Sequence, residues 1–93
     1  MILTTTNSIE NHKINDYLGI VTGVSLTVYS IFSSNNLPKA VDSAKEKAFK
    51  KLMHNANNLK ANAVIGIKVD VEILGQFYKV CVSVTGTAVK VME

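Results

Sequence analysis

The sequence lacks arginine and tryptophan, and it contains one cysteine, Cys81, and one proline, Pro38. A single cysteine excludes a disulfide within the chain and is typical of a reducing compartment. All ten basic residues are lysines, and the absence of arginine argues against sequence-specific nucleic-acid recognition, because arginine supplies most bidentate contacts to phosphate and guanine.

No apolar run approaches the roughly 18 residues that a membrane-spanning helix needs. The first six residues carry no signal segment, so we expect a cytoplasmic protein without a membrane partner.

Residues 1–93 are predicted to form one globular domain. Hydrophobic residues make up 47% of the chain and charged residues 18%, which excludes a disordered protein. The net charge of +3, without tryptophan and with few other aromatic residues, is a weak indication of nucleic-acid binding. Binding through the helix lysines is therefore an unfavoured alternative, which a steep dependence on salt would reveal.

Apolar residues alternate with polar ones along residues 63–74 and again along 77–91, which predicts two half-buried strands. Gly75 and Gln76 between them suit a two-residue type II′ turn. That turn sets the register of a hairpin in which Asp70 lies opposite Cys81 and Glu72 opposite Lys79. The expected apolar pairs are Ile67–Val84, Val69–Val82, Val71–Val80 and Ile73–Tyr78.

Residues 17–30 predict another long strand with two different faces. One face carries Leu18, Ile20, Thr22, Val24, Leu26 and Val28. The other face carries Gly19, Val21, Gly23, Ser25, Thr27 and Tyr29. We expect the large apolar face to pack on the helix and the small-residue face to pack on another subunit. The alternative for the two glycines is a bulge or bend at Gly19 or Gly23.

Residues 37–59 predict a long amphipathic helix. Four residue types that favour N-caps precede it, namely Ser33, Ser34, Asn35 and Asn36. Pro38 suits the first turn, and Glu46 and Lys50 are spaced for an ion pair. The apolar stripe consists of Val41, Ala44, Ala48, Phe49, Leu52, Met53, Ala56 and Leu59. Ahead of these elements, residues 2–6 predict a short strand and residues 7–16 a loop.

The order strand, strand, helix, strand, strand predicts an α+β fold, a two-layer β-α-β-β sandwich. We expect the last strand to lie between the two strands that the helix connects, so that the three form an antiparallel sheet with the long helix on one face. Residues 2–6 add a short extra N-terminal strand. The other face of the sheet stays uncovered in a monomer, and exposed apolar sheet favours oligomerisation.

Asp70, Glu72 and Cys81 form the candidate metal site, since the expected register brings these side chains to one outward face. A cluster of carboxylates and a thiolate binds borderline or soft metals. A structural cysteine beside solvated charges is the competing interpretation. One cysteine makes a closed site only if subunits share it. No cofactor other than a metal ion is indicated.

Two further features of the sequence could carry chemistry. His54 would need an orienting carboxylate and a nucleophile to be catalytic, and the spacing of residues assembles neither, so we predict that the protein is not an enzyme. Residues 85–88, around Gly86, could form an anion-binding nest. A β-bulge explains the change of apolar phase at this point more simply.

Several segments together resemble the YbjQ-like family. Residues 59–66 read LKANAVIG, similar to the family signature L-G-A-[ND]-A-V-[VI]-G. Residues 82–89 read VSVTGTAV, similar to V-x-x-x-G-T-A-V, and residues 17–23 read YLGIVTG, similar to Y-x-G-x-V-x-G. The threonines at positions 4–6 also fit, and the four pieces occur in the family's order over most of the chain.

The resemblance implies a dodecin-like subunit and a ring-shaped homo-oligomer, a pentamer, in a family labelled "putative heavy-metal-binding" whose role is not established. The chain departs from the family twice. Lys60 stands where the family has glycine after the helix, which costs about 1 kcal/mol if that position is left-handed. The family's G-G-R-S stretch before the helix is missing.

We therefore expect a non-enzymatic, homo-oligomeric binding or scaffold protein with a small-ligand or metal site at its subunit interfaces. The candidate interface residues are Gly19, Val21, Gly23, Ser25, Gly86 and Thr87. The alternative is a heavy-metal sensor or store that uses the carboxylate and thiolate face. An assembled oligomer distinguishes the first hypothesis, and loss of metal binding in Cys81→Ser distinguishes the second.

Overall fold

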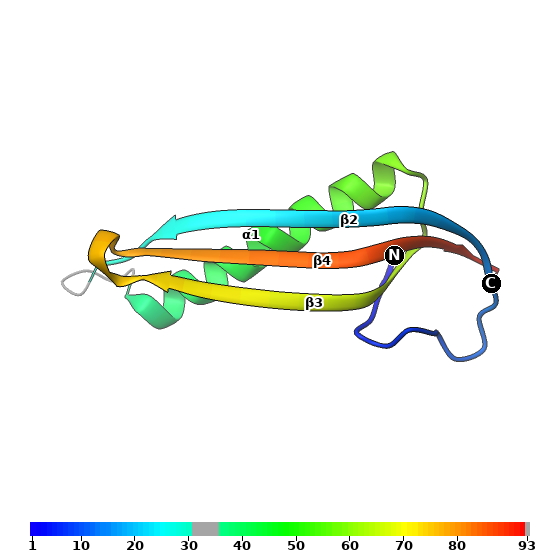
Figure 1. Ribbon diagram of the computed structural model, residues 1–93, viewed down its shortest axis with the longest axis horizontal. Coiled ribbons are helices and arrows are strands. Elements are labelled where there is room, and N and C mark those ends of the chain that lie inside the picture. The colour runs from blue at the N-terminus through cyan, green and yellow to red at the C-terminus, as the bar shows by residue number, and fades with distance from the viewer. Residues whose placement is uncertain (31–35, 93) are drawn as a thin grey trace.

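The computed structural model of the chain describes residues 1–30 and 36–92, and it places one helix against one face of a four-stranded sheet (Figure 1). The elements are β1 (Ile2–Leu3), β2 (Ile14–Val28), α1 (Leu37–Asn58), β3 (Ala63–Leu74), a 3₁₀ turn (Gly75–Phe77) and β4 (Lys79–Val91). The strand order is β1-β3-β4-β2. The molecule is elongated, about 49 × 22 × 17 Å, because the long strands and the helix run along one direction.

The predicted architecture is confirmed. β4 lies between β2 and β3 and is antiparallel to both, and β1 adds a short parallel strand to β3. α1 begins at the predicted residue and ends within one residue of the predicted end. Of the predicted N-cap residues, Ser33, Ser34 and Asn35 lie outside the described residues. Asn36 is the N-cap, and its Oδ1 accepts a hydrogen bond from the Lys39 N–H at 3.2 Å.

The C-terminal end of α1 has the hydrogen bonds of a Schellman motif. The Ala61 N–H donates to the Ala56 carbonyl at 3.1 Å, and the Lys60 N–H donates to the Asn57 carbonyl at 2.9 Å. This motif needs a left-handed residue, and Lys60 has φ +63°. The expected left-handed position is therefore confirmed, with lysine in a conformation that glycine adopts at lower cost.

The helix packs on the face of β2 that was expected to contact another subunit. Its buried side forms a ridge of residues four apart, Ala40, Ala44, Ala48, Leu52 and Ala56. A Cβ on Gly23 would overlap the Ala48 carbonyl and lie 2.7 Å from the Leu52 nitrogen, so the helix backbone rests directly on this strand. The predicted assignment of the two β2 faces is therefore wrong, because small residues on both elements permit the closest packing.

The predicted hairpin turn is also wrong. A type II′ turn needs a positive φ at Gly75, which is absent among the positive-φ glycines of the described chain. Instead, a 3₁₀ turn is followed by Tyr78 at φ +51°. Tyr78 packs edge-on against Tyr29 with the ring centroids 5.6 Å apart, and the Tyr29 N–H donates to the Tyr78 carbonyl at 2.8 Å. The tyrosine thus belongs to the loop and not to the strand.

The longer loop moves the register of the hairpin by two residues. Val71 lies opposite Val82, Glu72 opposite Cys81 and Asp70 opposite Ser83. The expected Asp70–Cys81 and Glu72–Lys79 pairs do not form. Side chains alternate with a period of two, so a shift of two residues keeps each strand's apolar residues on the predicted face.

The bulge expected at Gly86 lies on the neighbouring strand. β4 pairs continuously with β2 through Gly86, whereas the β3 register shifts between Ile65 and Lys68, around Gly66 at φ +61°. The apolar residues of β4 change from even to odd positions after Gly86, because the C-terminal end of this strand is covered on both faces of the sheet. On the face opposite α1, Ile9 and Ile14 pack on Ala63, Ile65, Val89 and Val91.

Candidate functional site

The open face of the sheet, the face opposite α1, exposes several large apolar side chains. Along the edge strand β2 it carries the β2 stripe, which consists of Ile20, Val24, Leu26 and Val28. These side chains are 76%, 49%, 55% and 58% exposed. They alternate with the small residues under the helix, so they all point away from α1. The β2 stripe is an apolar strip along one edge of an otherwise polar surface.

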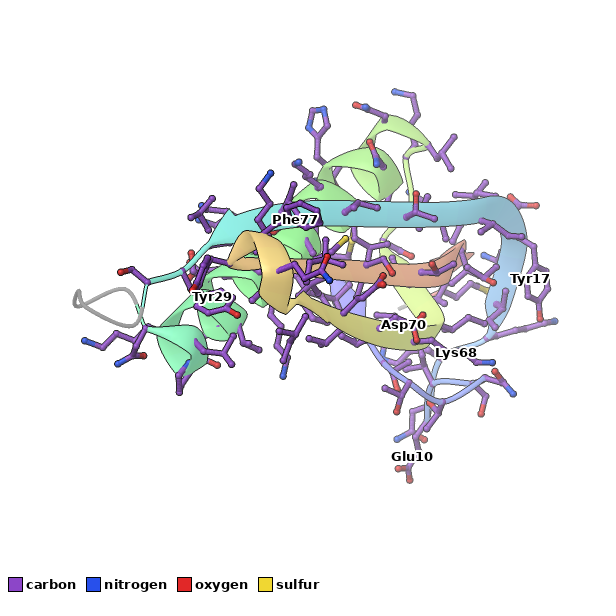
Figure 2. All side chains as sticks on the ribbon, turned by 60° about the vertical axis from the view of Figure 1, so that its left-hand side comes forward. Glu10, Tyr17, Tyr29, Lys68, Asp70 and Phe77 are labelled. Carbon is purple, nitrogen blue, oxygen red and sulfur yellow. The ribbon has the colours of Figure 1, made fainter. Side chains whose placement is uncertain are left out.

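Next to the β2 stripe, the open face carries the candidate metal ligands. The register places Leu26, Cys81 and Glu72 in one row across the three strands. The neighbouring row contains Val24, Ser83 and Asp70. Lys68 and Asp70 both project from β3 (Figure 2). The structure therefore brings all three predicted ligands to one face, with Glu72 directly opposite Cys81.

The three side chains do not form a closed metal centre within one subunit. Among residues 1–30 and 36–92, no three histidine, cysteine, aspartate or glutamate side chains gather closely enough to hold an ion. Cys81 is a free, half-buried thiol. Two facing ligands are half of a tetrahedral site, so a metal here would need further ligands from another copy of the chain.

The predicted interface residues lie in different places. Val21, Gly23 and Ser25 are covered by the chain's own helix. Gly86 packs against Ile65 and Ile67, with its missing Cβ 3.1 Å from the Ile65 carbonyl. These four residues are therefore unavailable on the open face.

The other two interface candidates belong to the sheet's open end. Thr87 lies opposite Ile20, in the row of the open face beside the β2 stripe. Gly19, at φ +130°, sits where the β2 register shifts against β4. The alternative interpretation of a bulge at Gly19 is thus confirmed.

The outer edge of β2 is covered by side chains from α1. Lys51 Nζ donates to the Val24 carbonyl at 2.9 Å, and Asn55 Nδ2 donates to the Thr22 carbonyl at 2.8 Å. A shallow cavity of about 370 Å³ lies between these elements and is also lined by His54. The described lining holds no carboxylate to orient this histidine, so the cavity supplies no catalytic pair.

A second exposed apolar strip was missed by sequence reasoning. The β3 strip, consisting of Val69, Val71 and Ile73, lies on the helix side of the sheet but is 40%, 42% and 50% exposed. α1 crosses the sheet diagonally (Figure 1) and contacts mainly β2 and β4, so these three β3 side chains are only partly covered on that side. The small residues of β2 and α1 were the signal, because they place the helix over β2 and away from β3.

These features define a class of protein, an α+β domain in which one helix covers one face of the sheet and apolar side chains stand exposed on the opposite face. The chain belongs to the YbjQ family, because the model of that family, described as "Putative heavy-metal-binding", matches residues 1–92. No helix in the described part of the chain is long and apolar enough to span a membrane.

Relatives of known sequence and structure agree with this assignment. The chain is 37% identical to a UPF0145 protein from Anoxybacillus flavithermus, covering 100% of both chains. It is 36% identical to a UPF0145 protein from Corynebacterium jeikeium, covering 96% of this chain and 97% of that one. A solved structure from Pediococcus pentosaceus, a protein of unknown function from the DUF74 family, has a TM-score of 0.72 at 23% identity and covers 99% and 98% of the two chains. The last likeness shows the fold alone.

Proposed function

We propose that the chain is a non-enzymatic subunit of a homo-oligomer, in which other copies cover the open face and a small ligand or metal binds between subunits. The observation that supports this proposal is the β2 stripe. Four large apolar side chains stand about half exposed or more on the edge strand of a 93-residue domain. Aligned apolar side chains on an open sheet are typical of a surface that another protein covers.

The size of the β2 stripe sets the scale of the stabilisation that one subunit contributes to a contact. Full burial of a large apolar side chain contributes about 1.5–3 kcal/mol, so covering four half-exposed ones contributes roughly 3–6 kcal/mol. Association costs about 4–15 kcal/mol in lost translational and rotational freedom. One such contact is therefore marginal, whereas a ring gives every subunit two contacts. Five subunits is the number that the family resemblance implies.

Leu26→Lys tests this proposal, because it places a charge in the middle of the β2 stripe. We expect light scattering and native mass spectrometry to show an oligomer for the natural protein and at least a two-fold lower assembly mass for the variant. Leu59→Lys is the matched control, since Leu59 is an exposed leucine at the end of α1. A natural protein that is monomeric at micromolar concentration would contradict the proposal, as would an unchanged mass for Leu26→Lys.

The second candidate function is heavy-metal binding at a site that subunits share. Two observations favour it: Glu72 lies directly opposite Cys81, and the family description names heavy metals. Cys81 and Glu72 supply two ligands, and a borderline metal such as Zn²⁺ or Cd²⁺ would take the remaining two from a neighbouring copy.

Titration of the metal-free protein with Cd²⁺ tests the shared site. We expect Cys81→Ser to remove binding, while Ser83→Ala, one row away on the same face, leaves it unchanged. Disassembly by Leu26→Lys should weaken binding as well, because each subunit holds only part of the ligand set. Unchanged Cd²⁺ affinity in Cys81→Ser would exclude this site.

A further inference from the structure

The two outer edges of the sheet differ in how their backbone is covered. On β2, Lys51 and Asn55 donate to the Val24 and Thr22 carbonyls, as described above. These side chains occupy the acceptors that an added strand would use, at the centre of that edge. Two outward carbonyls at the centre of the β2 edge thus have side-chain donors from its own helix.

The outer edge of β3 is covered only at its start. The Gly66 N–H donates to the Thr6 carbonyl at 2.8 Å, and the Ile67 N–H donates to the Thr4 carbonyl at 3.1 Å. Backbone groups in a strand alternate in direction, so the N–H and C=O of Val69, Val71 and Ile73 point the same way as those of Ile67. The described residues supply no hydrogen-bond partner to these outward groups.

The side chains of the same three residues are the β3 strip. These three side chains are β-branched and exposed, and they lie beside the outward backbone groups that have no partner among the described residues. An exposed apolar edge of this length is a template for pairing with another strand. Proline, which blocks pairing at many sheet edges, is absent from residues 68–74, and the charged residues of this segment, Lys68, Asp70 and Glu72, lie on its other face.

We propose that β3 pairs, antiparallel, with β3 of a second copy of the chain, in a contact separate from the one that the β2 stripe makes. The charges on the other side of β3 support this partner. With Val69 opposite Val71 of the second copy, Lys68 lies opposite Glu72 of that copy, and the pair occurs twice about the two-fold axis. Asp70 lies directly opposite its counterpart at the axis, and this repulsion offsets part of what the two Lys68–Glu72 pairs contribute.

Amide hydrogen exchange tests the pairing residue by residue. At high protein concentration the amides of Val69 and Val71 should exchange at least ten-fold more slowly than at high dilution. The amides of Asp70 and Glu72 point toward β4 and serve as internal controls that stay protected at both concentrations. Outward amides that exchange equally fast at both concentrations would overturn the proposal.

Val71→Pro tests the same contact through the mass of the assembly. Proline removes an N–H that points outward, so the pairing with β4 is kept, whereas the intermolecular hydrogen bond is lost. Val71→Thr keeps the N–H and the β-branched shape, and it is the matched control. We expect Val71→Pro to halve the assembly mass and Val71→Thr to leave it unchanged. Equal masses for the two variants would overturn the proposal.

A third variant separates this contact from the proposed ring. If the β3 contact is independent, Leu26→Lys should still form a dimer, and adding Val71→Pro should convert that dimer into a monomer. A Leu26→Lys protein that is already monomeric at high concentration would overturn the β3 contact, while leaving the β2 contact supported.

Discussion

The two faces of β2 carry opposite kinds of side chain, and their burial is the reverse of what hydrophobicity alone favours. Toward α1 the strand presents Val21, Gly23, Ser25 and Thr27, which are covered. Away from α1 it presents Ile20, Val24, Leu26 and Val28, which are exposed. The difference shows that α1 packs on the face of β2 that it can approach most closely, and this packing leaves the large apolar residues exposed.

Close approach also accounts for the protected edge. Because Gly23 and the alanines of α1 let the backbones come together, Lys51 and Asn55 reach the β2 carbonyls with hydrogen bonds of 2.9 and 2.8 Å. A helix held farther away by large side chains would leave these carbonyls open. The same packing places α1 mainly over β2 and β4, so two outward carbonyls of β2 have donors from the helix, whereas, among the described residues, the outer edge of β3 has none there.

The largest expected effect comes from Gly23→Ala, which breaks the close contact on the small face. The added methyl would overlap the Ala48 carbonyl, and backbone yields less easily than a side chain. We expect a loss of about 3 kcal/mol in the free energy of unfolding, measured by urea denaturation.

Gly75→Ala is the control for this substitution, since no heavy atom lies within 4 Å of the position that its Cβ would occupy. It should change the free energy of unfolding by less than about 0.5 kcal/mol. If the two alanine variants were equally stable, the helix would not rest on Gly23.

A smaller change in the free energy of unfolding is expected from Thr27→Val. This substitution removes a polar group from the face of β2 that α1 covers. The hydroxyls of Ser25 and Thr27 are buried and have no hydrogen-bond partner among the described residues. Replacing one with a methyl group of the same shape removes a desolvation cost, so we expect Thr27→Val to raise the free energy of unfolding by about 1 kcal/mol.

Thr22→Val on the exposed face of the same strand is the control for Thr27→Val. The Thr22 side chain is solvated, so this variant should change the free energy of unfolding by less than about 0.5 kcal/mol. A destabilised Thr27→Val protein would show that the buried hydroxyl has a partner in solution.

The smallest effect on the single subunit is expected from Leu26→Lys. Its side chain stands in solvent in one copy, so the free energy of unfolding, measured where the protein is dilute and monomeric, should change by less than about 0.5 kcal/mol. The same substitution is expected to change the assembly mass strongly. A large loss of stability at high dilution would mean that the open face folds against its own chain.

The fold was predictable because its signals are local. The alternation of β3 and β4, the i+4 spacing in α1 and the N-cap at Asn36 each depend on neighbours in the sequence. The register of the hairpin was not predictable, since it depends on a contact between residues far apart in the sequence. Tyr78 lies in the loop and packs on Tyr29, which follows β2. For the same reason the predicted pairing of the candidate metal ligands was wrong, since Glu72 and not Asp70 lies opposite Cys81, and metal binding by these residues stays a prediction.

By itself, the sequence determined the elements, their order and the α+β class, because periodicity, caps and connection lengths depend on residues close together in the chain. It also indicated the family, because short sequence segments can be compared without knowledge of the fold. Only the tertiary structure decided which face of β2 lies under the helix and which sheet edge stays open. Those outcomes depend on how closely two backbones approach, and that distance is set by Gly23 and the alanines of α1 acting together across the core.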